Sequence, residues 1–105
     1  MKALRIYTLK NQAMADLYFN VHWQRHLISL PKYHIQVDNV QLEQVKREDE
    51  SCRVFALVHT EDGDDMETLN AKYMQSDDFK ADMAGYDMTA ILNVEEVKLK
   101  SSLEL

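Results

Sequence analysis

The chain has 105 residues, which is the size of one domain, and its 46% hydrophobic and 29% charged residues are typical of a globular protein. The net charge of -6 would repel nucleic acid and anionic membranes, and no apolar run approaches the roughly 20 residues of a membrane span. A single cysteine excludes an internal disulfide, and the N-terminal residues lack the apolar core of a signal peptide. These features predict one cytoplasmic domain over residues 1–105 that binds neither nucleic acid nor membrane.

Residues 3–9 predict a first strand, because Leu4 and Ile6 are two positions apart and would point to the same, apolar face of a strand. A helix is predicted from Asn11, whose side chain can accept a backbone N–H, to Leu30, where Pro31 stops it. The stripe expected to face the sheet consists of Met14, Leu17, Tyr18, Val21 and Ile28. An opposite stripe consists of Phe19, Trp23, Leu27 and Leu30. It either packs under a loop or against the partner subunit, as we favour, or walls a ligand pocket.

Residues 34–45 predict an edge strand, and the change of phase at Asp38–Asn39 indicates a bulge before the charged turn of residues 46–50. Residues 52–60 predict a central strand that is apolar on both faces. Phe55 and Leu57 point to the face opposite Val54, Ala56 and Val58. A chain of this length cannot easily cover both faces, so we expect helices on one face and a second copy of the protein on the other.

The C-terminal half predicts two helices and a final strand. Asp64 is the expected N-cap of the first helix, with Glu67 completing a capping box, and Ser76 is the expected N-cap of the second. The last strand is predicted over residues 89–99, again apolar on two sides, and residues 101–105 form a tail. The order strand, helix, strand, strand, helix, strand predicts an α+β, ferredoxin-like βαββαβ fold with a four-stranded antiparallel sheet.

Three segments resemble a known family. Residues 4–10 (LRIYTLK) resemble the first strand of the NIPSNAP family, and residues 18–27 (YFNVHWQRHL) resemble its first helix. Residues 73–79 (YMQSDDF) are similar to an aromatic, serine, aromatic spacing found across the dimeric α/β-barrel superfamily. The resemblance implies a homodimer in which two sheets face each other with the helices outside. That superfamily includes antibiotic-biosynthesis monooxygenases, haem-degrading enzymes, cyclases and isomerases.

Several side chains are candidates for chemistry. If the protein is an enzyme, we expect His59 or His22 as a base and Tyr7 or Tyr73 as an orienting hydroxyl. A histidine such as His59 is more often a partly solvent-exposed residue at the rim of a sheet than a catalytic one. Residues expected to line a pocket are Tyr18, Trp23, His26 and Phe79.

No metal or other cofactor is expected. His22 and His26 lie one helical turn apart but lack an evident third ligand, and the acidic run at 61–65 lacks the spacing of a calcium loop. The haem-degrading enzymes of the superfamily carry an axial histidine where this sequence has Met83. This departure argues against haem, although a thioether can also ligate iron. No residue close to Cys52 in the sequence could act as a base toward its thiol, so we interpret Cys52 as a structural residue and not a nucleophile.

Two hypotheses follow. The first is a NIPSNAP-like homodimer that binds a small molecule or a partner and has no chemistry of its own. The second is a cofactor-independent enzyme of the monooxygenase, cyclase or isomerase type, acting on a small aromatic or polyketide-like substrate. The second hypothesis requires a cavity of roughly 300 Å³ or more that contains a histidine and a tyrosine.

Overall fold

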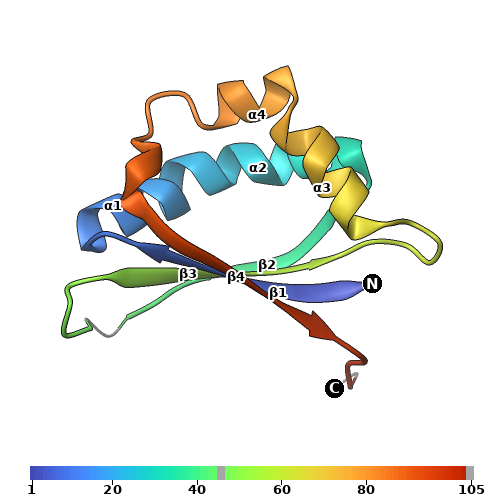
Figure 1. The fold of residues 1–105 in the computed structure, drawn as a ribbon, viewed down its shortest axis with the longest axis horizontal. Coiled ribbons are helices and arrows are strands. Elements are labelled where there is room, and N and C mark those ends of the chain that lie inside the picture. The colour runs from blue at the N-terminus through green and yellow to red at the C-terminus, as the bar shows by residue number, and fades with distance from the viewer. Residues whose placement is uncertain (45–46, 104–105) are drawn as a thin grey trace.

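The computed structural model describes residues 1–44 and 47–103, so the predicted strand end at residue 45, the first residue of the charged turn and the last two residues of the tail lie outside the described residues. Four antiparallel strands form one sheet in the order β2-β3-β1-β4, and the helices lie together on one face of it (Figure 1). The strands are β1 Lys2–Leu9, β2 Gln36–Leu42, β3 Cys52–His59 and β4 Ile91–Leu99. This confirms the predicted ferredoxin-like α+β fold.

β3 is a central strand, as predicted. It pairs with β1 on one side and with β2 on the other. Its residues Val54, Ala56 and Val58 face the helices and are fully buried, which makes them the floor of the core. Phe55 and Leu57 lie on the opposite face, here called the open face, and are partly exposed.

β1 turns its cleaner apolar side away from the helices. Arg5 pairs with Ala56 and Ile6 pairs with Phe55, so Arg5 shares the helix-covered face and Ile6 shares the open face. The helix-covered face of β1 therefore carries Ala3, Arg5, Tyr7 and Leu9. A buried arginine and a tyrosine thus lie between sheet and helices, where the alternation pattern alone would have placed aliphatic side chains.

The first helical segment is interrupted by a π-helical turn. It comprises α1 Gln12–Leu17, the π-turn Tyr18–His22, α2 Trp23–Ser29 and a 3₁₀ turn Leu30–Tyr33. As predicted, the Asn11 side chain caps its start by accepting the N–H of Met14. Within the π-turn the N–H of Trp23 bonds to the carbonyl of Tyr18, five residues back.

The predicted main stripe of this helix is confirmed only in part. Tyr18 is buried and Met14 is half-buried, but Leu17, Val21 and Ile28 are exposed, and of these three only Ile28 follows the π-turn. A π-turn inserts an extra residue, so the residues after it face a different direction from the one that a continuous 3.6-residue repeat would give. Ile28 is 71% exposed. The buried side of the segment is formed by Ala15, Tyr18, His22, Trp23, His26, Ser29 and Leu30.

Two further helices, α3 Met66–Met74 and α4 Asp77–Asp82, complete the helical layer. The N-cap of α3 is Asp65, which accepts the N–H of Glu67; the prediction of Asp64 was one residue too early. Ser76 caps α4 as predicted, since its Oγ accepts the N–H of Phe79 at 3.1 Å. A 3₁₀ turn, Met88–Ala90, then leads into β4.

Both outer strands are partly exposed. β2 lies at one edge, with the predicted irregularity between Val37 and Asn39. β4 lies at the other edge, and its Leu92, Val94 and Val97 are exposed, so the two-sided coverage predicted for this strand is not provided by the chain itself. Among the described residues, no helix has the length and apolar character needed to cross a membrane.

Candidate functional site

A cavity of about 390 Å³ lies between the helices and the β1–β4 side of the sheet. Its apolar lining consists of Leu30, Met74, Phe79, Met83, Met88, Ile91 and Val94. Its remaining lining consists of residues with polar atoms, namely Arg5, Tyr7, Tyr18, Trp23, His26, Asn70, Tyr73 and Glu96. An apolar hollow with a few converging polar groups is the usual form of a small-molecule site.

The sheet supplies one charged pair to this cavity. Arg5 of β1 and Glu96 of β4 are paired across the two strands, and Arg5 Nε lies 3.4 Å from Glu96 Oε2. Arg5 is only 5% exposed, yet its Nη2 atom has no hydrogen-bond partner among the described residues. A buried guanidinium N–H without an acceptor is costly, so this atom is a donor that a bound molecule could satisfy.

Three aromatic side chains line the same cavity as Arg5. Tyr7, Tyr18 and Trp23 pack edge to face, with ring centroids 5.4 to 6.2 Å apart. Burial raises the pKa of Tyr7, while the nearby Arg5 guanidinium partly offsets the rise. Burial also raises the pKa of Tyr18 well above its ordinary value. Both phenols are therefore protonated near neutral pH and offer hydroxyl groups beside the cavity.

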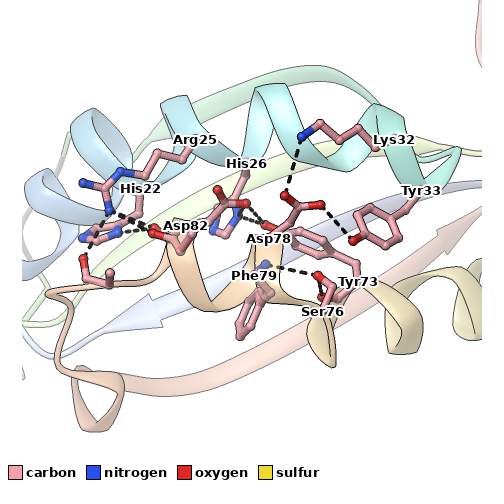
Figure 2. A network of polar contacts seen from close by, with 12 residues as sticks. His22, Arg25, His26, Lys32, Tyr33, Tyr73, Ser76, Asp78, Phe79 and Asp82 are labelled. Carbon is pink, nitrogen blue, oxygen red and sulfur yellow. Dashed lines mark hydrogen bonds and ion pairs between the residues drawn. The ribbon is translucent and has the colours of Figure 1, made fainter.

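His26 connects the cavity to a polar chain in the helical layer. Its Nδ1 lies 2.5 Å from the Tyr73 hydroxyl, and that hydroxyl donates to Oδ2 of Asp82 at 2.5 Å (Figure 2). His26 is 3% exposed, and its other nitrogen, Nε2, has no partner among the described residues. The polar chain thus ends at a histidine nitrogen that has no hydrogen-bond partner in the described part of the chain.

Burial determines the protonation of this histidine. The pKa of His26 is lowered to about 4, mainly because burial disfavours the imidazolium; Asp82 opposes this change and His22 adds to it. His26 is therefore neutral near pH 7. The pKa of Tyr73 is raised, first by burial and then by its hydrogen bond to Asp82, so Tyr73 also stays protonated.

The backbone of Asp82 is fixed from the first helical segment. His22 Nδ1 donates to the Asp82 carbonyl oxygen at 2.7 Å, and Arg25 Nη1 donates to the same oxygen at 3.2 Å (Figure 2). Arg25 also donates to the Ala84 carbonyl. These contacts satisfy carbonyls at the C-terminal end of α4, which have no partners within the helix. They hold the Asp82 carboxylate near Tyr73.

Ser76 and Asp78 fix the start of α4. Ser76 Oγ donates to the Tyr73 carbonyl at 2.5 Å while it accepts the N–H of Phe79. Asp78 accepts the Tyr33 hydroxyl at 2.9 Å and lies 3.5 Å from Lys32 Nζ (Figure 2). The predicted aromatic, serine, aromatic segment therefore joins α3 to α4 and places the rings of Tyr73 and Phe79 in contact, 5.3 Å apart.

The structure places the two tyrosines expected to act at the cavity, but not the two histidines expected as bases. Tyr7, Tyr73 and all four expected lining residues, Tyr18, Trp23, His26 and Phe79, line it. His22 is not among the lining residues, because its ring packs against Tyr86 and its Nδ1 is bonded to α4. His59 pairs with Lys2 on the open face and lies 2.9 Å from Asp38, so the sheet separates it from the cavity.

Sequence reasoning missed Arg5, Glu96 and Asp82. A signal existed for Arg5, which interrupts an otherwise apolar strand, but alternation could not show that its face is the covered one. Asp82 carried no signal, because an aspartate in a short helix is usually solvated. The second predicted stripe of the first helix contributes to two hollows. Leu30 lines the cavity, Trp23 lines both hollows, and Phe19 and Leu27 line a second hollow of about 320 Å³ against β2.

The side chains of this site are not arranged as a set of metal ligands. Within residues 1–44 and 47–103, no three His, Cys, Asp or Glu side chains are arranged to hold a metal ion. His22 and His26 direct their Nδ1 atoms to separate protein partners. Met83 lines the cavity, and Cys52 is a buried free thiol whose pKa is raised by burial.

Comparison with known proteins supports the fold. No family model matches the chain, and no curated protein matches it either. Among solved structures, it resembles a Caulobacter crescentus protein provisionally assigned as an antibiotic biosynthesis monooxygenase. The two share 19% sequence identity with a TM-score of 0.56 over 95% of this chain and 91% of the other. This likeness, together with the strand order, establishes the ferredoxin-like α+β fold of the chain.

Proposed function

We propose that this protein binds a small aromatic or polyketide-like molecule in the cavity between its helices and β1 and β4. One observation carries the proposal: an apolar hollow of about 390 Å³ is lined by a buried arginine, Arg5, whose Nη2 has no hydrogen-bond partner among the described residues. The volume lies within the roughly 300–1,000 Å³ usual for ligand sites. The aromatic walls favour a flat ring, and Arg5 favours an acceptor oxygen such as a carbonyl on that ring.

The NIPSNAP-like assignment is part of this proposal. It is supported by the convergence on one place of the two segments that resemble the NIPSNAP family and the third that resembles the wider superfamily. Tyr7 comes from the first segment, Trp23 and His26 come from the second, and Tyr73 and Phe79 come from the third; all five line the cavity. Short segments far apart in the chain that share one cavity wall are better explained by a common site than by the needs of packing alone.

We also propose that the protein is a homodimer formed through the open face of the sheet. The described chain leaves this face uncovered (Figure 1). Leu4, Ile6, Phe55 and Leu57 are partly exposed there, and Val97 is exposed beside them. A contiguous apolar strip on an uncovered sheet face is typical of an association surface. A second copy would bury the same strip on both chains, as a two-fold interface requires.

A cofactor-independent enzyme of the monooxygenase, cyclase or isomerase type is the second candidate. It is favoured by Arg5, which could stabilise negative charge developing on a substrate oxygen, and by the shared fold with the Caulobacter protein. The low pKa of His26, about 4, makes this histidine a weak base in the empty site. For this reason binding and orientation of the ligand are the better supported role.

Binding is testable with three matched ligands. These are 4-hydroxyacetophenone, 4-methoxyacetophenone and 4-ethylphenol, which differ in a hydroxyl donor and a carbonyl acceptor. Trp23 is the only tryptophan of the chain, so its indole N–H gives one signal in a ¹H–¹⁵N spectrum and reports events at the cavity wall. We expect at least one ligand to shift this signal in a saturable manner.

Matched variants locate the binding site. Val94 lines the cavity beside Tyr7, with which it pairs across β1 and β4, and it is exposed, so Val94→Phe should reduce the available volume without disturbing the core. Leu92→Phe makes a similar change on the same strand at an exposed residue that does not line the cavity. We expect affinity to fall about tenfold or more in the first variant only. Equal affinity in both variants, or no binding of any ligand by the wild type, would refute the proposal.

The enzyme candidate has its own test. Turnover of 4-hydroxyacetophenone or a larger phenolic ketone by the purified protein in air would be followed by mass spectrometry of the products. Product that forms with wild-type protein and is lost in Arg5→Met would favour catalysis. Saturable binding without turnover across such substrates would leave the protein as a binding protein.

A further inference from the structure

Asp82, Tyr73 and His26 form a hydrogen-bond chain with a fixed direction. The Tyr73 hydroxyl donates its only proton to Asp82 Oδ2. Its oxygen must therefore act as an acceptor in the contact with His26 Nδ1, which means that Nδ1 carries a proton. In a neutral imidazole the other nitrogen then has a lone pair and no proton, so His26 Nε2 is a hydrogen-bond acceptor.

This acceptor lies at the wall of the candidate site. His26 lines the cavity, and its ring contacts those of Trp23 and Phe79, which also line it, at centroid distances of 5.0 and 6.2 Å. Nε2 is buried and has no partner among the described residues. A buried acceptor without a donor costs free energy, and a ligand hydroxyl group would recover part of that cost.

We propose that Asp82 and Tyr73 are positioning residues that hold His26 with Nε2 as an acceptor, so that the site selects ligands carrying a phenolic or enolic hydroxyl group. This inference rests on the proposed binding function. That function requires an acceptor oxygen on the ligand for Arg5, and the inference adds a second requirement, a hydroxyl donor on the ligand for His26. The selected class is therefore a phenol or enol with a separate carbonyl, rather than its ether.

The carboxylate of Asp82 sets the direction of the hydrogen bonds in this chain. A carboxylate only accepts hydrogen bonds, so it imposes one orientation on Tyr73 and, through it, one tautomer on His26. An asparagine at this position has an N–H group that can donate to the Tyr73 oxygen. Tyr73 could then donate to His26 Nδ1, and the imidazole proton would move to Nε2, where it blocks a ligand donor.

The first measurement is the tautomer of His26 in the free protein. Two-bond ¹H–¹⁵N spectra distinguish an imidazole protonated on Nδ1 from one protonated on Nε2. We expect the Nδ1–H form in the wild type and a substantial Nε2–H population in Asp82→Asn. Asp78→Asn is the matched control, because Asp78 lies on the same helix, also accepts a tyrosine hydroxyl and does not line the cavity.

The second measurement is ligand preference. The wild type should bind 4-hydroxyacetophenone about tenfold more tightly than 4-methoxyacetophenone, the effect of one hydrogen bond. The preference should fall below about threefold in Asp82→Asn and remain in Asp78→Asn. Tyr73→Phe, which keeps the ring and removes the hydroxyl, should lose the preference in the same way, so the test does not depend on one variant folding.

The outcomes separate this inference from the proposed function. If no ligand binds, the proposed function fails, while the tautomer spectra still test the hydrogen-bond chain. If ligands bind but the ether binds as well as the phenol, the inference is wrong and the binding function stands. An Nε2–H tautomer in the wild type, or an unchanged tautomer and preference in Asp82→Asn, would equally overturn it.

Discussion

Arg5 and Glu96 face each other across β1 and β4 on the side of the sheet that the helices cover, with Nε and Oε2 separated by 3.4 Å. The pair uses only one edge of the guanidinium, since Nη2 has no partner among the described residues. A buried cation that is only partly paired is expensive to keep in a core. Its position at the cavity wall is the reason why we propose that it recognises a ligand.

Arg5→Met should separate this role from packing. Methionine keeps much of the length and apolar volume of the side chain but removes every donor. We expect affinity for 4-hydroxyacetophenone to fall about tenfold, because its carbonyl loses a charged donor, while 4-ethylphenol, which has no carbonyl, keeps its affinity. Calorimetric titration of both ligands measures this, and an equal loss for the two ligands would indicate a general packing defect.

Stability should fall as the solution is acidified because of His26. The pKa of His26 is lowered to about 4 in the folded protein, whereas an unfolded chain has a histidine pKa near 6.5. Between these values the unfolded state binds a proton that the folded state does not, so stability decreases as pH falls through this window. The loss from this group is about 3 kcal/mol at most, and stability at neutral pH contains its full contribution.

Urea unfolding at pH 7 and at pH 4.5 measures the effect. Carboxylates also titrate in this range, so the informative quantity is the difference between the wild type and His26→Gln. Glutamine retains an amide donor for Tyr73 but does not titrate. We expect a smaller drop in the free energy of unfolding for the variant. Parallel drops in the two proteins would show that His26 is already protonated or well hydrated in the folded state.

The π-turn sets which side chains of the first helical segment reach the core. Removing the exposed residue Asn20 should restore an ordinary helical turn and rotate α1 by about 100° relative to α2. Tyr18 and Ala15 would then leave the core, at an expected cost of about 3 kcal/mol or more. Asn20→Ala keeps the chain length and should change the free energy of unfolding by less than about 0.5 kcal/mol. Equal stability of the two variants would show that the turn is not required.

The open face of the sheet predicts different effects for neighbouring residues of β3. Leu57→Asp places a charge on the partly exposed open face, so we expect a folded monomer where the wild type is a dimer. Val58→Asp places a charge in the helix-covered core, where Val58 is fully buried, and should prevent folding. Light scattering and thermal melting distinguish the two results. A monomeric wild type at micromolar concentration would contradict the proposed dimer.

Local rules allowed part of the structure to be predicted from the sequence. The caps at Asn11 and Ser76 follow from side chains that can accept a nearby backbone N–H, and both are confirmed. The order of strands and helices is set by periodicity and turn residues, and the two-sided apolar pattern of β3 places it at the centre of the sheet. These features depend on residues a few positions apart, so the sequence contains them directly.

The faces of the elements required the tertiary structure. Alternation shows that β1 has two sides but not which side the helices cover, and strand pairing decided that Arg5 is inside. The 3.6-residue repeat showed two apolar stripes on the first helical segment but not which side would be buried, and it gave no sign of the π-turn that redirects the residues after it. The candidate site depends both on which face of β1 the helices cover and on which side of the first helical segment is buried.

The sequence by itself determined the elements, their order, and the aromatic and histidine residues available for a site. The sequence already indicated His26 as a lining residue. Only the tertiary structure decided that His22 and His59, the expected bases, are not among the residues that line the cavity, and that Asp82 is hydrogen-bonded to Tyr73 beside His26. The physical reason is that hydrogen bonds between residues such as His26 and Tyr73, 47 positions apart, form only after α3 and α4 pack on the first helical segment.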